Sequence, residues 1–142
     1  MKKLVAGTVF AYAWLMATGY LINGVWLMRD YMLTPDSWRP QAVMQHKFWI
    51  MWAAELLFTV MFVWVYPRGL EKKPWAGQGI RYGIVMSLLV MIPESLYEYV
   101  IYRVNYRVNH VLAVKWMASG TVQFIVMGLI VAFVYKAPSP KV

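Results

Sequence analysis

Four long apolar runs, separated by polar segments, organise the chain. The runs cover residues 4–28, 48–66, 80–102 and 111–135. Each is close to the roughly 20 residues that an α-helix needs to cross the hydrocarbon core of a bilayer. None shows the alternation of apolar and polar positions that a membrane β-strand requires. The pattern predicts an all-α integral membrane protein, a four-helix transmembrane bundle in one domain over residues 1–142.

The polar segments between the runs are rich in residues that end helices. The segment "PRGLEKKPWAGQG", residues 67–79, combines glycine, proline and lysine and predicts a tight turn. In the longer first segment, Pro40 suits a first helical turn, so the second helix is expected to begin between Pro40 and Phe48. The tail, residues 136–142, is expected to be disordered.

The composition fits a lipid environment better than a soluble domain. The chain is 61% hydrophobic and only 14% charged, and its mean hydropathy is +0.51. A soluble globular domain is usually about 45–50% apolar and about 25% charged. The chain has no cysteine, which excludes disulfides, thiolate metal sites and cysteine-held iron–sulfur clusters.

The net charge of +8 is carried by residues that cluster between the apolar runs. This placement favours anchoring against anionic lipid headgroups and argues against nucleic-acid binding. The N-terminus, the second connector and the tail together hold eight Lys and Arg residues, and the other two connectors with their helix ends hold six. The surplus predicts a multi-pass protein of the cell inner membrane with both termini in the cytoplasm.

Polar side chains interrupt the apolar runs at similar depths, on the side of the first and third connectors. From the helical rise, Glu98 lies about 6 Å and Glu94 about 12 Å inward from the end of the third helix. The same arithmetic places Glu55, Lys115 and Asn23 about 10, 6 and 7 Å inward on their own helices. All five therefore fall in the leaflet on that side.

Helical spacing places these residues on faces with other small or polar residues, and such faces are expected to meet inside a membrane bundle. The expected buried polar cluster consists of Asn23, Glu55, Glu94, Glu98, Lys115 and Gln123. Three carboxylates would then face one lysine, so a proton, a further cation or a cationic ligand would be needed. Pro93 removes a helical hydrogen bond and predicts a kink beside Glu94. A purely structural role for the cluster stays open beside a functional one.

The only two histidines, His46 and His110, are expected at the starts of the second and fourth helices. Opposed histidines could ligate a haem, or could join Glu55 and Glu94 in a metal site. The spacing Glu-x-x-His, which is typical of metal-binding bundles, is absent from the sequence. Histidines at a membrane edge are also common as simple interfacial residues.

No nucleotide-binding or hydrolase motif occurs in the chain. The leading hypothesis is a non-enzymatic accessory or scaffold subunit of a larger membrane assembly. Its expected partners are the lipid bilayer and another membrane protein or a second copy, with no cofactor.

Two alternative functions remain. The first is a small proton-coupled carrier in which Glu94 titrates and Lys115 is the counter-ion, with Glu55 and Glu98 assisting. The second is a haem- or metal-binding redox subunit that uses the two histidines.

Overall fold

The computed structural model describes residues 1–33, 35, 38–71, 73–101 and 106–136, with residues 101 and 106–109 described by their backbone alone. Within these ranges every regular element is a helix. The tail that was expected to be disordered lies, beyond its first residue, outside the described residues.

The first two long helices run in opposite directions. Helix α1 (Lys2–Gly19) continues into the π-helical segment η1 (Tyr20–Trp26). Helix α4 (Phe48–Val65) ends in the 3₁₀ turn η3 (Tyr66–Gly69). Both are long and apolar enough to cross a membrane, which agrees with the expected runs.

The third long helix has three parts and the fourth has one. The third consists of α5 (Trp75–Met86), the π-helical segment η4 (Ser87–Met91) and α6 (Ile92–Ile101). The fourth is α7 (Tyr106–Tyr135). Each contains a stretch long and apolar enough to cross a membrane. The described part of the chain therefore has the four candidate spans that the sequence predicts.

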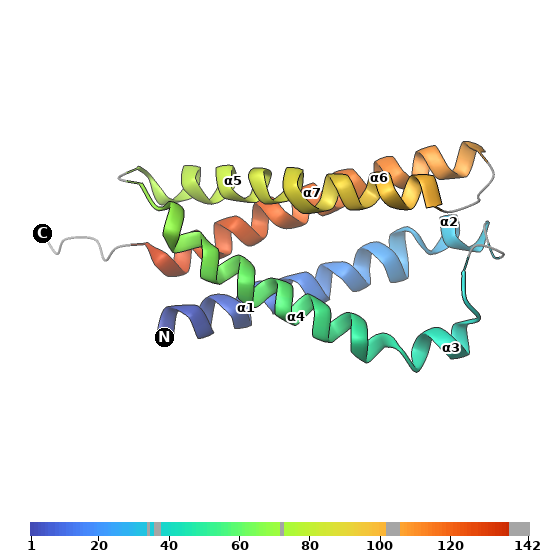
Figure 1. Cartoon of the computed structure of the whole chain (residues 1–142), viewed down its shortest axis with the longest axis horizontal. Coiled ribbons are helices and arrows are strands. Elements are labelled where there is room, and N and C mark those ends of the chain that lie inside the picture. The colour runs from blue at the N-terminus through green and yellow to red at the C-terminus, as the bar shows by residue number, and fades with distance from the viewer. Residues whose placement is uncertain (34, 36–37, 72, 102–105, 137–142) are drawn as a thin grey trace, which may run out of the picture.

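Two ends of the bundle can be distinguished (Figure 1). The inner end, as we call it, holds the start of α1, the connection from α4 to α5 and the end of α7. The outer end holds the end of α6, the start of α7 and two short helices, α2 (Met28–Met32) and α3 (Gln41–Gln45). Pro40 is the N-cap of α3, and the chain bends again at Lys47 before α4 begins. The helical turn expected after Pro40 is thus a separate helix.

Two spans extend further than hydropathy alone indicates. The third begins at Trp75, directly after Pro74, and not at residue 80. The fourth begins at Tyr106 and not at residue 111. Backbone hydrogen bonding continues through polar residues, whereas an apolar run stops at the first of them.

A seam of small residues joins α5 and α7. A Cβ atom built on Gly79 would lie 2.8 Å from the carbonyl oxygen of Gly128, and one built on Gly83 would collide with the backbone at Phe124. Further along the same seam, the hydroxyls of Ser87 and Thr121 are hydrogen-bonded at 2.7 Å. Small residues allow two helix backbones to approach closely, which is the usual way in which membrane helices pack.

Aromatic rings attach α4 to this pair in the inner half of the bundle. Phe58 stacks on Phe124 with 5.2 Å between ring centroids, and the buried Phe62 meets the edge of Tyr82 at 4.6 Å. The Tyr82 hydroxyl also donates a 2.6 Å hydrogen bond to the Phe62 carbonyl.

The outer half of α4 diverges from the other helices (Figure 1). All seven residues from 48 to 54 are exposed. Seven residues make about two helical turns, so side chains on every face of this stretch are at least partly exposed. The inner half of α4 is therefore packed in the bundle, whereas its first two turns bury no residue and are linked to α1 by a 3.2 Å hydrogen bond from the Tyr12 hydroxyl to the Trp52 carbonyl.

Candidate functional site

The ion pair between Asp30 and Lys115 joins the first span to the fourth at the outer end. Lys115 Nζ lies 2.7 Å from Asp30 Oδ2, and the two side chains are 29% and 17% exposed. Asp30 is in the first turn of α2, where an acidic residue is favourable, and the buried Leu27 directly precedes that helix. The Lys115 ammonium also lies 5.6 Å from the centroid of the Trp26 ring.

Tyr31, the next residue of α2, makes a second link between the same spans. Its hydroxyl donates a 2.6 Å hydrogen bond to Asn23 Oδ1 and accepts a 2.9 Å hydrogen bond from Trp116 Nε1. Burial raises the pKa of Tyr31, and the hydrogen bond from Trp116 partly opposes this rise. The negative charges of Glu98 and then Asp30 raise the pKa further.

We call this group the outer polar cluster; its members are Asn23, Asp30, Tyr31, Lys115 and Trp116. Asn23 and Lys115 were expected in a buried polar cluster, whereas the other three were not; Asn23 is exposed. Asp30 and Tyr31 lie in the first connector, and Trp116 is an aromatic residue near the start of the fourth apolar run. The periodicity of polar residues within a helix therefore did not indicate these three. The hydrogen bonds and the ion pair of this cluster hold the segment from η1 to α2 against α7.

The structure groups the expected carboxylates differently. Lys115 is paired with Asp30 and not with a glutamate of α6. Glu94 is exposed, Glu98 is half-buried near Tyr31, and Glu55 is half-buried on α4. Among the described residues, no hydrogen bond or ion pair reaches the carboxylate of any of these three glutamates.

The π-helical segment η4 explains why Glu94 is not inside. Ser87 is buried and bonded to α7, and a spacing of seven residues would place Glu94 on the same face of a regular α-helix. Between the two residues, η4 has the wider π-helical turn, which shifts the register. The neighbour Ser95 is fully buried in its place. This π-helical segment ends at Met91, two residues before Pro93, beside which a kink was expected.

Gln123 belongs to a different contact, nearer the middle of the bundle. Its Nε2 donates a 2.7 Å hydrogen bond to Thr18 Oγ1. The backbone carbonyl oxygen of Gln123 accepts a 3.2 Å hydrogen bond from Trp14 Nε1. Gln123 therefore joins α1 to α7 at a position closer to the inner end than the outer polar cluster.

The two histidines lie on different parts of the outer end. His46 is the exposed C-cap of α3, and α3 and the first turns of α7 lie on opposite edges of the molecule (Figure 1). His110 in α7 lies against Tyr99, with Nε2 3.3 Å from its hydroxyl. In the described part of the chain, no three His, Asp or Glu residues are grouped so that they could hold a metal ion.

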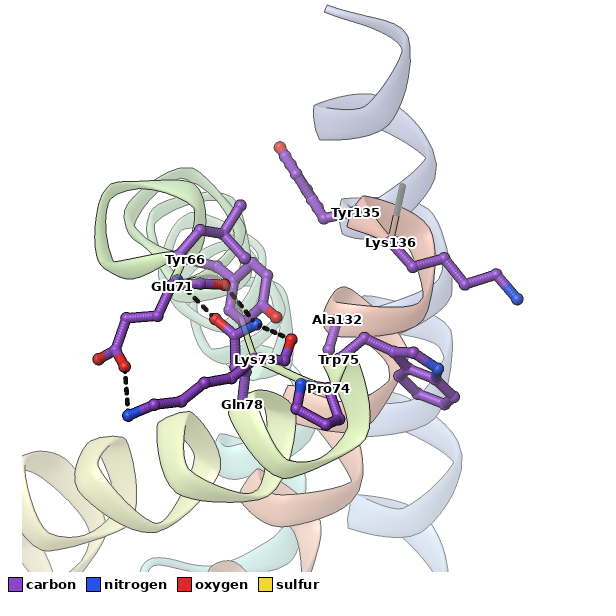
Figure 2. Close-up of a pocket in the computed structure, with 10 residues that line it drawn as sticks. Tyr66, Glu71, Lys73, Pro74, Trp75, Gln78, Ala132, Tyr135 and Lys136 are labelled. Carbon is purple, nitrogen blue, oxygen red and sulfur yellow. Dashed lines mark hydrogen bonds and ion pairs between the residues drawn. The ribbon is translucent and has the colours of Figure 1, made fainter. Parts of the chain in front are cut away.

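A pocket of about 490 Å³ opens at the inner end, between the turn that follows η3 and the end of α7 (Figure 2). The residues that line it are Tyr66, Leu70, Glu71, Lys73, Pro74, Trp75, Gln78, Ala132, Tyr135 and Lys136. The Gln78 side chain holds the turn closed. Its Oε1 accepts a 2.8 Å hydrogen bond from the Glu71 amide, and its Nε2 donates to the carbonyls of Glu71 at 2.9 Å and Lys73 at 2.7 Å.

Charged side chains surround this pocket. Glu71 is paired with Lys73 at 2.5 Å and with Arg81 at 2.6 Å, and the hydrogen bonds from Arg81 and Lys73 lower the pKa of Glu71 to about 2. The Lys136 ammonium lies 3.8 Å from the centroid of the Phe133 ring. The sequence pattern did not predict this pocket, because a segment rich in glycine, proline and lysine indicates only a turn with basic residues that anchor to headgroups.

In the described part of the chain, charged side chains are grouped at the outer polar cluster and around the inner pocket. No protein family, curated protein or solved structure matches this chain. The functional conclusion therefore depends on the geometry of the chain itself.

Proposed function

We propose that this chain is a membrane-spanning, non-enzymatic accessory or scaffold subunit of a larger membrane assembly. The four long apolar helices support insertion in a membrane. The surplus of Lys and Arg at the inner end supports an orientation in the cell inner membrane with both termini in the cytoplasm.

The exposed carboxylate of Glu94 is the observation that carries this proposal. Glu94 lies six residues before Val100, the end of the candidate span, and therefore about 9 Å inside it. An ionised side chain that faces lipid at such a depth is costly, so acids within spans usually meet a partner or a water-filled cavity. A neighbouring helix with a basic or hydrogen-bond-donating side chain would provide such a partner.

The open start of α4 supports the same function. Its first two turns expose large apolar side chains on every face, including Trp49 at 65% and Ile50 at 50%. One lipid-facing side is normal for a membrane helix, but in a completed bundle another side is packed. A partner helix against this stretch would complete the packing.

A proton-coupled carrier is the second candidate, and the half-buried Glu55 and Glu98 favour it. Acids inside a membrane bundle without a counter-ion are typical of proton pathways. The ion pair with Asp30 already engages Lys115, however, so the counter-ion role expected for this lysine is less favourable. In a carrier, Glu55→Gln and Glu94→Gln would abolish proton uptake by vesicles and leave assembly unchanged.

The test compares assemblies from gently solubilised membranes by native gel and mass spectrometry. The wild-type chain of 16.6 kDa is expected in a large band with constant partners. Glu94→Gln should weaken that band, and Glu94→Leu should release the chain while leaving it at least as stable by itself. Glu71→Gln is the matched control, because Glu71 lies in the turn outside the spans.

Two outcomes would contradict the subunit proposal. The first is a wild-type chain that migrates alone under the gentlest extraction. The second is a set of partners that survives Glu94→Leu unchanged.

A further inference from the structure

The two ends of the molecule differ sharply in charge. Among the described residues, the inner end carries six basic side chains and one acidic one, Glu71. The six basic residues are Lys2, Lys3, Arg68, Lys73, Arg81 and Lys136. The outer end carries four basic and four acidic side chains in the same set. An anionic ligand is therefore attracted to the inner end, where the pocket opens.

The pocket has the size and the wall of a ligand site. Its volume of about 490 Å³ falls within the range of about 300–1,000 Å³ that is typical of small-molecule sites. Leu70, Pro74, Trp75 and Tyr135 give it a largely apolar and aromatic wall. Such a wall suits a ligand that is itself partly apolar, with a charged group toward the rim.

Tyr66 supplies a hydrogen-bonding group that has no partner within the described structure. The residue is only 3% exposed, and its hydroxyl oxygen is buried without a hydrogen bond. Its ring is held between Tyr82 at 5.2 Å and Tyr135 at 5.7 Å, so it lies in the wall of the pocket. A buried hydroxyl without a partner is unfavourable. A ligand oxygen that enters beside Tyr135 would provide the missing acceptor.

The start of α5 adds a positive helix end. This helix of 12 residues begins at Trp75, which lines the pocket, and it has no side-chain cap. Uncapped N–H groups and the helix dipole both favour an anion at this position.

Two lysines stand on opposite sides of the opening (Figure 2). Lys73 is 61% exposed and bonded to Glu71, which Arg81 also holds. Lys73 can therefore turn toward a ligand while Arg81 keeps Glu71 neutralised. Lys136 lies over the Phe133 ring and is exposed, so it is also able to turn.

We propose that this pocket binds the phosphate headgroup of an anionic phospholipid from the leaflet at the inner end. Lys73 and Lys136 contact the phosphate at the rim, Tyr66 donates a hydrogen bond from the wall, and Trp75 packs on the glycerol region. Basic pockets between membrane helices on the cytoplasmic side are suited to such headgroups. The inference rests on the membrane placement in the proposed function, but it needs no partner protein.

The experiment measures thermal unfolding and lipid adducts of the purified full chain in detergent. Phosphatidylglycerol is added in one arm, phosphatidylcholine in a second and inorganic phosphate in a third. Phosphatidylglycerol is expected to raise the Tm and to give a discrete adduct by native mass spectrometry, whereas the other two additions leave the Tm unchanged. Lys73→Gln and Lys136→Gln should each weaken phosphatidylglycerol binding about fivefold.

Two further variants separate a defined site from general attraction. Lys2→Gln removes the same charge at the same end but away from the lining residues, so binding should be retained. Tyr66→Phe removes only the hydroxyl without a partner. The lipid-free Tm should therefore hold or rise, while phosphatidylglycerol binding falls about tenfold.

Several results would overturn the inference. Equal stabilisation by phosphatidylcholine would show that the headgroup is not recognised, and equal stabilisation by inorganic phosphate would show that the ligand is not a lipid. Full lipid binding by Tyr66→Phe, or an equal loss in Lys2→Gln, would show that the pocket is not the site. A chain that migrates alone on the native gel but binds phosphatidylglycerol would contradict the subunit proposal and leave this inference intact.

Discussion

Single residues at the outer end show how strongly context decides the role of a charge. Lys115 and Asp30 are mostly shielded from solvent, and their ion pair connects segments 85 residues apart. Exposed ion pairs contribute about 0–1 kcal/mol, whereas removing one partner of a fully buried pair costs about 3–5 kcal/mol. A half-shielded pair lies between these limits. Glu94, at a similar depth, makes no such contact among the described residues.

We expect Lys115→Met to lower the free energy of unfolding by about 1–3 kcal/mol, because Asp30 then loses the ammonium group that lies 2.7 Å from it. Denaturant unfolding in detergent measures this loss. Lys47→Met is the control, since Lys47 is an exposed lysine at the same end. In a double-mutant cycle with Asp30→Asn, the coupling energy should be about 1 kcal/mol. Strictly additive effects would show that the pair contributes no stability.

At the scale of elements, the pairing of α5 with α7 depends on glycine and the register of α6 depends on a π-helical segment. Gly79, Gly83 and Gly128 bring two backbones into contact, where any side chain would separate them. The segment η4 then changes which residues of α6 face α7, so that Ser95 is buried and Glu94 is exposed. Two consecutive parts of one span thus follow different facial patterns.

The glycine seam gives a sharp prediction. Gly83→Ala should destabilise the fold by about 1–3 kcal/mol, because the new methyl group meets the backbone at Phe124 and Ile125, which cannot turn away. Gly77→Ala lies in the same helix with no atom within 4 Å of the added methyl group, so it should be neutral or stabilising by up to about 1 kcal/mol. Thermal unfolding of both variants in one detergent tests the pair. Equal Tm values would contradict the close packing of α5 on α7.

At the scale of the whole molecule, the inner and outer ends of the bundle differ in charge and in packing. Both described terminal regions and the connection from α4 to α5 share the inner end (Figure 1). The described residues of that end have an excess of basic side chains, whereas those of the outer end carry four basic and four acidic ones. The outer end is also where α4 opens away from the bundle. This difference is consistent with the two proposals, a lipid bound at the inner end and a partner protein bound at the outer end.

The absence of cysteine from the sequence allows a direct test of the topology. Single cysteines at Lys2 and Gly69 should be labelled by an impermeant maleimide only after cells are opened. Cysteines at Arg39 and Gln45 should be labelled in intact cells. These four positions are exposed, so the two sets differ only in their end of the bundle. Labelling of all four in intact cells would contradict a spanning arrangement, and the inverse pattern would reverse the orientation.

The amino-acid sequence by itself determined the number and the approximate limits of the helices that are long and apolar enough to span a membrane. An apolar run of about 20 residues is a local property, because it reflects the length of helix that hydrocarbon requires. The sequence also placed Asn23 and Lys115 among the polar positions at the outer end, and the structure finds both in the outer polar cluster.

Tertiary structure decided which side chains meet. The partnership of Lys115 with Asp30 depends on how α2 folds back after Leu27, and no periodicity within a helix encodes it. The outward direction of Glu94 depends on one π-helical segment, which shifts every later position of the span. The inner pocket depends on the distance between a turn and the end of α7, which are far apart in the chain. The length and hydrophobicity of a helix are properties of one segment of the sequence. Which side chains meet depends on how each helix is rotated about its axis and how closely it approaches its neighbours.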